Sequence, residues 1–362
     1  MTKYRVIQYG TGSTGKQAIR AFVDHPELEL VGCLVHSPEK VGLDAGEIAG
    51  VGRMGVICTD SVADIVAMDA DAVSFMGLWP DLDLICSLLE SGKHVALTAG
   101  LIFPDYLGPS VVARLEAACL IGGTCVYGGG LSPGYVETIA PITLTNLARR
   151  TDRIVIEEYV DYHDHPDSVE LIRDMLGLGR PLDDVQREPH PYFEEMMPRF
   201  YLQALALLAA AVKLDVERFE SQVEHIVSPG GGQLEAFNIE PGTVGGVVAS
   251  FTAYASGEPK IQLRLNWIAA PDLAGRIFGE YGMSNSTQWR ITVEGDPSMR
   301  LTFEQADSFL GRIGARAKST EHSFIMTAMN IVNAIPYLCE AREPGIKHHA
   351  NLPLMAGRHT LR

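Results

Sequence analysis

Cysteine is scarce in this chain and follows no metal-binding or disulfide pattern. The six cysteines show no C-x-x-C spacing, and most of them lie within apolar runs; they are Cys33, Cys58, Cys86, Cys119, Cys125 and Cys339. This usage excludes a disulfide framework and favours reduced thiols in the core of a cytoplasmic protein.

Positive charge and long apolar runs are lacking as well. Lys+Arg 29 against Asp+Glu 45 gives a net charge of −16, with no run of basic residues, which argues against a nucleic-acid partner. The most apolar helical stretch, residues 202–214, is shorter than the ~20 residues that span a membrane. The N-terminus leads directly into a strand pattern, so no signal peptide is expected. We therefore expect a cytoplasmic protein with a small-molecule substrate.

The composition is that of an ordinary globular protein. The chain has 362 residues, of which 46% are hydrophobic and 20% are charged. A chain of this length can form two domains, each with its own core.

The first part of the chain alternates between short apolar strands and helical stretches. The predicted strands are residues 5–9, 28–35, 56–59, 72–76, 94–98 and 124–127, and the predicted helices include 16–23, 62–68, 82–90 and 110–120. This alternation predicts βα units and a parallel, doubly wound sheet with both faces covered. Residues 1–134 are thus expected to form a Rossmann domain.

The pattern changes after residues 128–134. Longer strand patterns follow at 153–162, 223–227, 246–254, 260–267 and 288–294, several of which alternate apolar and polar residues. They predict a C-terminal α+β domain, residues 135–318, with an open mixed or antiparallel sheet covered on one side by a helix at 198–213. A last helix, 319–339, begins a tail to residue 362 that is expected to pack back on the Rossmann domain. The fold class is therefore α/β.

A glycine-rich turn stands between the first strand and the first helix. It reads Gly10, Thr11, Gly12, Ser13, Thr14 and Gly15. In a G-x-G-x-x-G turn at this place, Gly10 permits the tight turn, Gly12 admits a pyrophosphate and Gly15 allows close helix packing. The helix N-terminus adds free N–H groups and a positive dipole. The turn predicts a dinucleotide site.

The end of the second strand bears on the choice of dinucleotide. NAD-selective sites usually carry a carboxylate there for the ribose 2′-hydroxyl, whereas this chain has His36 and Ser37, with Lys40 close behind. A hydroxyl and two cations suit a 2′-phosphate, so NADP(H) is favoured. NAD(H) stays possible because Glu39 lies in the same loop.

Three further loops follow the fourth, fifth and sixth strands. They contain Gly77, then Thr98 and Gly100, and then Pro133 within residues 128–134. Because ligands bind at the carboxyl ends of parallel strands, we expect these residues near the nicotinamide ring.

Candidate proton donors lie in the second domain. Glu137 follows the loop at 128–134, while Tyr159 and His163 lie at the end of a predicted strand. Period-two alternation puts Glu157, Tyr159, Asp161 and His163 on one face, and Glu158, Val160 and Tyr162 on the other. Glu137, Tyr159 and His163 are the predicted catalytic residues. His163-x-His165 lacks a third ligand, so no metal site is predicted.

Several of these segments resemble the dihydrodipicolinate reductase superfamily, and in particular the branch of 2,4-diaminopentanoate dehydrogenase and the native NAD(P)H-dependent amine dehydrogenases. They are residues 10–18, 35–46, 128–135, 175–179, 293–297 and 332–336. The resemblance covers nearly the whole chain. It implies a Rossmann domain, an open-sheet substrate domain, a homodimer, and hydride transfer to C=N or C=O.

The chain departs from the branch at one segment. The amine dehydrogenases carry a Cys-Glu-Glu-Leu-type segment after the fifth strand, whose glutamate binds ammonia and the imine; here residues 98–104 contain no carboxylate. The histidine pair and catalytic lysine of dihydrodipicolinate reductases have no good match either. Three functions stay open: a carbonyl, imine or amine oxidoreductase, a true amine dehydrogenase using Glu137 or Glu157, and a sensor that binds NADP(H) without turnover.

Overall fold

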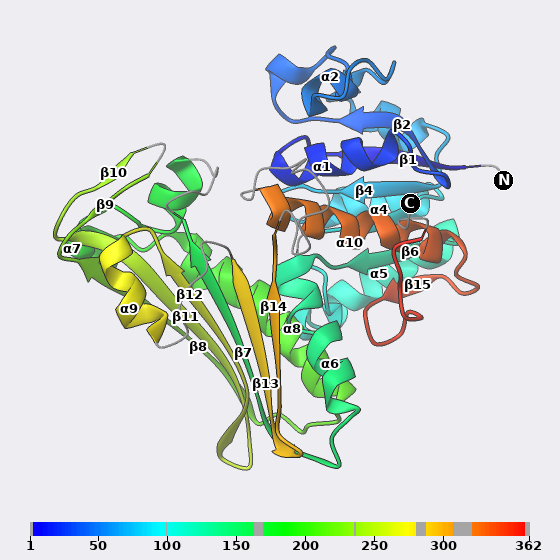
Figure 1. Cartoon of the computed structure of the whole chain (residues 1–362). Helices are drawn as coiled ribbons and strands as arrows, with labels where there is room; N and C mark the ends of the chain where they lie inside the picture. The colour runs from blue at the N-terminus through cyan, green and yellow to red at the C-terminus, as the bar shows by residue number, and fades with distance from the viewer. Residues whose placement is uncertain are drawn as a thin grey trace. The chain divides into compact units, whose positions relative to one another are not determined.

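The computed structural model describes residues 3–98, 100–162, 169–234, 237–279, 287–306 and 321–358. The chain forms two compact units. The first comprises Met1–Tyr135 together with Ser323–Arg362, and the second comprises Val136–His322. Figure 1 labels most of the helices and strands of both units.

The first unit is built on a seven-stranded parallel sheet. Its order is β15-β6-β5-β4-β1-β2-β3. The strands are β1 (Tyr4–Tyr9), β2 (Leu28–Leu34), β3 (Cys58–Thr59), β4 (Ala72–Phe75), β5 (His94–Leu97), β6 (Cys125–Gly128) and β15 (Gly345–Lys347). The chain order reverses between β1 and β4, which makes this edge the switch point of a doubly wound sheet. The predicted strands and their parallel pairing are confirmed.

Helices cover both faces of this sheet, and so successive residues of one strand enter different cores. Val6 packs on one side with α1, α2 and α10, while Ile7 packs on the other side with α3, α4 and α5. The helices are α1 (Ser13–Phe22), α2 (Ala45–Ala49), α3 (Val62–Ala67), α4 (Leu82–Glu90), α5 (Pro109–Gly122) and α10 (His322–Cys339). Burial on both faces explains why these strands are largely apolar.

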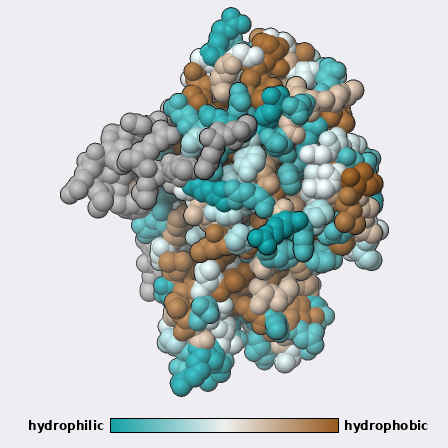
Figure 2. Space-filling view, turned by 90° about the vertical axis from the view of Figure 1, so that its right-hand side faces the viewer, coloured by the Kyte–Doolittle hydropathy of each residue, from teal (hydrophilic) through white to brown (hydrophobic). Residues whose placement is uncertain are grey.

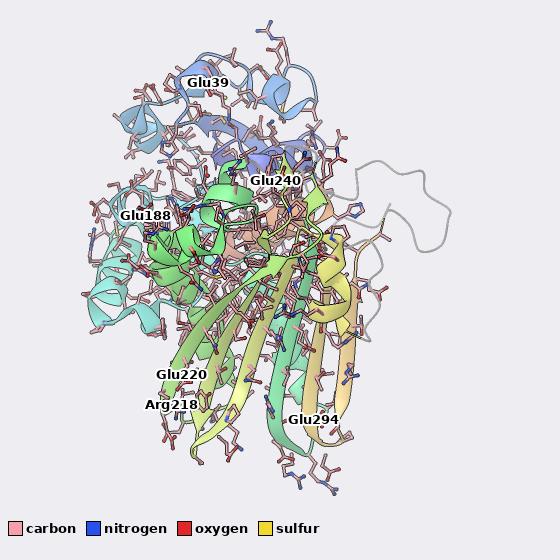
Figure 3. The ribbon with its side chains drawn as sticks, turned by 90° about the vertical axis from the view of Figure 1, so that its left-hand side faces the viewer. Glu39, Glu188, Arg218, Glu220, Glu240 and Glu294 are labelled. Atoms are coloured by element: carbon pink, nitrogen blue, oxygen red, sulfur yellow. The ribbon has the colours of Figure 1, made fainter. Side chains whose placement is uncertain are left out.

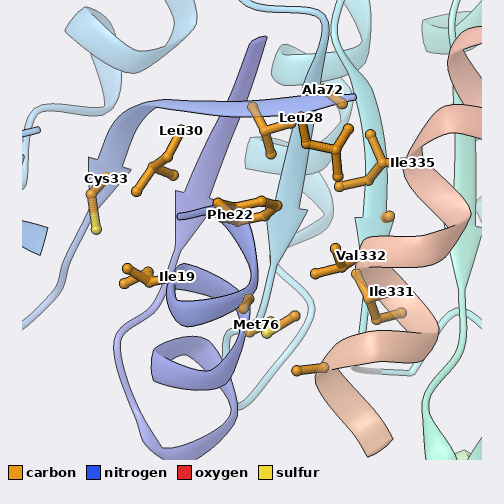
Figure 4. Packing of buried hydrophobic residues seen from close by; sticks show 14 of the residues in the cluster. Ile19, Phe22, Leu28, Leu30, Cys33, Ala72, Met76, Ile331, Val332 and Ile335 are labelled. Atoms are coloured by element: carbon orange, nitrogen blue, oxygen red, sulfur yellow. The ribbon is translucent and has the colours of Figure 1, made fainter. Parts of the chain in front are cut away.

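The end of the chain completes the first unit. Ile331, Val332 and Ile335 of α10 join Phe22 of α1 and Leu28 of β2 in one buried cluster (Figure 4). After α10, β15 adds to the edge of the sheet beside β6. This short strand was not predicted, because three residues carry too little periodicity to be recognised.

The second unit contains a six-stranded mixed sheet and a small hairpin. The sheet has the order β14-β13-β7-β12-β11-β8, with β7 and β12 parallel and the other pairs antiparallel. Its strands are β7 (Arg150–Asp161), β8 (Arg218–Ser228), β11 (Thr243–Ala255), β12 (Glu258–Ile268), β13 (Gln288–Asp296) and β14 (Met299–Glu304). The hairpin pairs β9 (Gly232–Gln233) with β10 (Asn238–Ile239). The predicted mixed sheet is confirmed.

One face of this sheet is covered by helices. Along β12, Ile261, Leu263 and Leu265 are buried, while Gln262 and Arg264 between them are more exposed. α8 (Met197–Ala211) packs on β11 and β12, where Tyr201 stacks on Phe251 with ring centroids 5.2 Å apart. The remaining helices are α6 (Ile139–Thr145), α7 (Leu182–Arg187) and α9 (Ala274–Ile277). Figure 3 looks onto the sheet, with the Arg218–Glu220 ion pair near one end of β8.

Short helical turns join several of these elements. They are η1 (Pro38–Lys40), η2 (Pro104–Leu107), η4 (Glu170–Met175), η5 (Tyr192–Met196) and η6 (Pro271–Leu273). Residues 131–135 form an irregular turn, because the backbone angles of Ser132, Pro133 and Gly134 are not helical.

Several large apolar side chains are exposed on the surface. The most exposed are Leu78, Leu120, Ile121, Leu147 and Leu354. Hydrophilic and hydrophobic residues are interspersed over the face shown in Figure 2. No helix within the described ranges has the length and hydropathy that crossing a bilayer requires.

We predict that the packing of α10 stabilises the first unit. Ile335→Ala removes a fully buried side chain from the α1–α10 cluster and should lower the free energy of unfolding by about 2–5 kcal/mol. Leu354→Ala is the matched control, since Leu354 is 80% exposed and its truncation should change stability by less than ~0.5 kcal/mol. Urea denaturation measures both variants; equal effects would contradict the packing.

Candidate functional site

The glycine turn is the whole connection between β1 and α1, because β1 ends at Tyr9 and α1 begins at Ser13. Gly10 has φ +85°, in the left-handed region that glycine adopts without strain, and its N–H donates to Leu34 O at 3.0 Å. A Cβ at Gly10 would lie 2.6 Å from Met76 O, and one at Gly15 would lie 2.1 Å from Gly10 O. Both glycines are therefore required by the packing of the turn itself.

Gly12 differs from the other two glycines. A Cβ built there would meet nothing within 4 Å, so the protein leaves the space above this residue open. Gly12 is also the N-cap of α1 and offers no side chain to satisfy the first-turn N–H groups, and that turn contains no acidic residue. An open space facing free amides and a positive helix end fits the pyrophosphate of a dinucleotide.

A cavity of about 420 Å³ lies at the carboxyl ends of β1 and β2. Tyr9, His36, Asp60, Asp81 and Leu84 are among its lining residues. The cavity adjoins the switch point of the sheet, where ligands bind in such folds. Its carboxylates suit hydroxyl and amino donors rather than phosphates, so its chemistry matches a nucleoside.

Tyr9 contacts several of the residues around this cavity. Its ring stacks on Phe75 with centroids 4.0 Å apart, and its hydroxyl contacts Nε2 of His36, whose ring stands edge-on 5.1 Å away. A Cβ at Gly77 would lie 2.6 Å from Cε1 of Tyr9, so Gly77 is needed to seat the tyrosine. Sequence reasoning missed Tyr9, because an aromatic residue ending a core strand gives no separate signal.

The predicted ribose-phosphate residues lie together after β2. His36 is exposed, and the Lys40 N–H donates to Ser37 O at 2.9 Å within the turn that contains both. Glu39, labelled in Figure 3, is exposed in the same turn. The glycine turn, His36, Ser37 and Lys40 are thus gathered at one edge of the sheet.

The predicted nicotinamide residues occupy loops at the same edge. Thr98 follows β5 and its N–H donates to Phe75 O at 3.1 Å, and Gly100 is buried with φ +71°. Pro133 is half-buried after β6 and its peptide bond with Ser132 is cis. Since β4, β5 and β6 are parallel neighbours, their carboxyl ends meet at one edge.

The predicted catalytic residues belong to different parts of the second unit. Glu137 is fully buried two residues before α6 begins. Tyr159 is buried near the end of β7, where its ring lies 5.6 Å from that of Phe278 and 5.8 Å from the Arg290 guanidinium. His163 lies outside the described residues.

Glu158 is a buried acid that sequence reasoning did not select. Its Oε1 accepts the indole N–H of Trp267 at 2.8 Å, and its Oε2 accepts that of Trp289 at 2.6 Å. The two tryptophans come from β12 and β13, the strands on either side of β7. A buried carboxylate is stable only with such donors. The sequence did contain one indication of this buried acid, because period-two alternation puts Glu158 on the apolar face of its strand.

Among the described residues of the second unit, Glu137 and Glu158 are the buried carboxylates. Tyr159 and Glu158 are consecutive on β7, so their side chains lie on opposite faces of the sheet. Across the ranges that the structure describes, no three His, Cys, Asp or Glu side chains form a group suited to a metal ion. All six cysteines are free thiols.

Comparison with known proteins finds relatives for both units. Residues 4–75 match the N-terminal domain of dihydrodipicolinate reductase, and residues 200–360 match the C-terminal domain of 2,4-diaminopentanoate dehydrogenase. An amine dehydrogenase of Streptomyces virginiae is 29% identical over 371 aligned residues, which cover 96% of each chain.

The chain is thus similar over nearly its whole length to an amine dehydrogenase, and parts of it match domains of dihydrodipicolinate reductase and 2,4-diaminopentanoate dehydrogenase. This similarity confirms the predicted resemblance, and with it the predicted class, an NAD(P)-dependent oxidoreductase.

Two solved structures share the fold of this relative of the amine dehydrogenases. An amine dehydrogenase from Mycobacterium smegmatis superposes with a TM-score of 0.76 at 21% identity, covering 98% of this chain and 97% of the other. A myo-inositol dehydrogenase from Lactobacillus casei, in complex with NAD(H) and myo-inositol, gives a TM-score of 0.56 at 13% identity and covers 97% and 90%. The predicted fold class is confirmed.

Gly12 and Gly15 should respond differently to an added methyl group. Gly12→Ala should fold normally but weaken NADPH binding at least tenfold, because its methyl group enters the open space that the pyrophosphate needs. Gly15→Ala should also lower the melting temperature by several degrees, because its methyl group strikes Gly10 O.

Fluorescence titration and thermal unfolding separate these two effects. Unchanged NADPH binding by Gly12→Ala would show that the dinucleotide does not use this turn.

Proposed function

We propose that the chain is an NADP(H)-dependent oxidoreductase that transfers a hydride to or from the carbon of a C=N or C=O group. Its proposed reaction is the reductive amination of a small, moderately hydrophobic ketone. The observation that carries the proposal is the alignment of an amine dehydrogenase over 96% of the chain, at 29% identity. The nucleotide turn of the first unit supplies the matching cofactor site.

The preference for NADP(H) rests on the turn after β2. His36 and Lys40 bring two potential cations and Ser37 a hydroxyl, all partly or fully exposed at the edge where a ribose 2′-phosphate would lie. The carboxylates of the neighbouring cavity, Asp60 and Asp81, serve the nucleoside instead. The resemblance further implies a homodimer.

The reaction needs one hydride, and its proton transfers must be controlled. The bound cofactor supplies the hydride. For reductive amination the balance is ketone + NH4⁺ + NADPH + H⁺ giving alkylammonium + NADP⁺ + water. The protein must orient the substrate, bind the nitrogen and move protons to the leaving oxygen.

The candidate acids for this chemistry lie in the second unit. Residues 98–104 contain no carboxylate at the place where the resemblance puts the ammonia-binding glutamate. Glu137 and Glu158 are both buried, and an acid in such surroundings can anchor a cationic amine. Tyr159 and His163 stay predicted proton donors.

Plain carbonyl reduction is the second candidate, and the lack of a carboxylate in residues 98–104 favours it. NADPH oxidation with a panel of ketones, in the presence and absence of ammonium, distinguishes the two reactions. We expect turnover that requires ammonium and yields the amine. Ammonium-independent formation of an alcohol would establish the carbonyl reductase, and tight NADPH binding without turnover would establish a sensor.

A substitution of Lys40 should affect the binding of NADPH and NADH differently. Lys40→Glu removes a cation from the proposed 2′-phosphate site and adds an anion, so the Kd for NADPH should rise about tenfold or more while that for NADH changes little. Lys260→Glu, with the same change of charge in the second unit, controls for net charge. An equal loss of affinity for both cofactors would show that Lys40 does not bind the 2′-phosphate.

The two buried acids can be assigned by conservative substitution. If Glu158 binds the reacting nitrogen, Glu158→Gln should lower kcat for reductive amination by about 100-fold or more, and Glu137→Gln should do so if Glu137 has that role. Glu188→Gln is the control, since Glu188 is exposed and lies outside the candidate site. Steady-state kinetics with unchanged NADPH affinity is the readout; full activity in both variants would exclude both acids.

A further inference from the structure

The loop after β6 is held from the other end of the chain. The N–H of Gly130 donates to Oδ1 of Asn330 on α10 at 2.9 Å. The hydroxyl of Tyr127, which lies on β6, donates to the same oxygen at 3.0 Å. One amide oxygen thus joins the last helix to the strand and to its loop.

The contact is tight enough to dictate the residue at position 129. A Cβ at Gly129 would lie 2.6 Å from Oδ1 of Asn330 and 2.5 Å from the Tyr127 hydroxyl. Both distances are shorter than real Cβ contacts, so the two polar groups lie directly against the backbone of the loop. Only glycine fits beneath them.

The direction of the hydrogen bonds is set by counting protons. Tyr127 is fully buried, and its hydroxyl also contacts Nε2 of His349. A phenol has one proton, which goes to Asn330, so Nε2 of His349 must donate to the phenol oxygen. Burial, with a smaller contribution from His348, lowers the pKa of His349 to about 3. The ring is therefore neutral at neutral pH, and its single proton lies on Nε2.

The geometry assigns Asn330 as a positioning residue for the nicotinamide half of the cofactor. It fixes the Gly130 amide, and the Tyr135 N–H in turn donates to Gly130 O at 2.9 Å, which closes the loop over Pro133. This assignment rests on the proposed function, because it takes the loop after β6 as the nicotinamide-facing loop. The ADP-ribose half binds at the glycine turn and does not depend on Asn330.

A purely structural role would make a different prediction from a positioning role. If Asn330 only stabilised the first unit, its loss would weaken all ligands alike or none. If it positions the loop, its loss should weaken ligands that contain the nicotinamide and spare those that do not. NADPH and 2′-phospho-ADP-ribose, which lacks the nicotinamide, form the required pair of probes.

The experiment measures Kd for both probes by calorimetry in the full-length protein. Asn330→Leu removes the acceptor at similar size and leaves the Gly130 N–H unpaired, so NADPH should bind about tenfold more weakly. Binding of 2′-phospho-ADP-ribose should stay within about twofold. Asn330→Asp keeps an acceptor oxygen and should retain NADPH affinity within about threefold. Asn330→Ala serves as a second test if the leucine variant does not fold.

Tyr127→Phe is the matched control, since it removes a hydroxyl from Asn330 without removing the bond to Gly130. Its NADPH affinity should change less than that of Asn330→Leu. Equal weakening of both probes by Asn330→Leu, or no weakening of either, would overturn the positioning role. A wild-type protein that binds neither probe would overturn the proposed function itself, and with it this assignment.

Discussion

The nucleotide site depends on one close approach of backbone to backbone. Position 15 lies so near the carbonyl oxygen of Gly10 that a Cβ there would be 2.1 Å from it, and this contact lets α1 begin directly at the end of β1. The helix start, with its unpaired amides, is thereby held at the same edge as the ends of β2, β4, β5 and β6. The cavity beside Tyr9 and the loop under Asn330 both lie at strand ends that this arrangement brings together.

Local patterns were sufficient to predict the first sheet. Its strands are short, apolar and separated by helices, and each signal lies within a few residues, as it does in the glycine turn. The mixed sheet was also predicted, because alternation such as that of Ile261, Gln262 and Leu263 reports a covered face and an open one. The roles of Gly10, Gly12 and Gly15 follow from the same local logic, and their different surroundings agree with it.

Contacts between distant segments could not be predicted in this way. β15 is too short to be periodic, and its pairing with β6 depends on the position of α10. Nothing near Asn330 in the sequence indicates that it meets Gly130, and nothing near Glu158 indicates that two tryptophans from neighbouring strands will bind its carboxylate. Period-two alternation correctly separates Glu158 from Tyr159, but which of the acids and tyrosines serves catalysis depends on three-dimensional neighbours that a strand pattern does not contain.

The return of the chain to its first unit has a consequence for synthesis on the ribosome. Leu28, Ala72 and Ala96 form part of an apolar surface that α10 covers, and α10 is translated only after the whole second unit. Until then the nascent parallel sheet has one incompletely shielded side and lacks its outermost strand, the kind of surface on which chaperones act. The core of the first unit is therefore completed only when α10 has been synthesised.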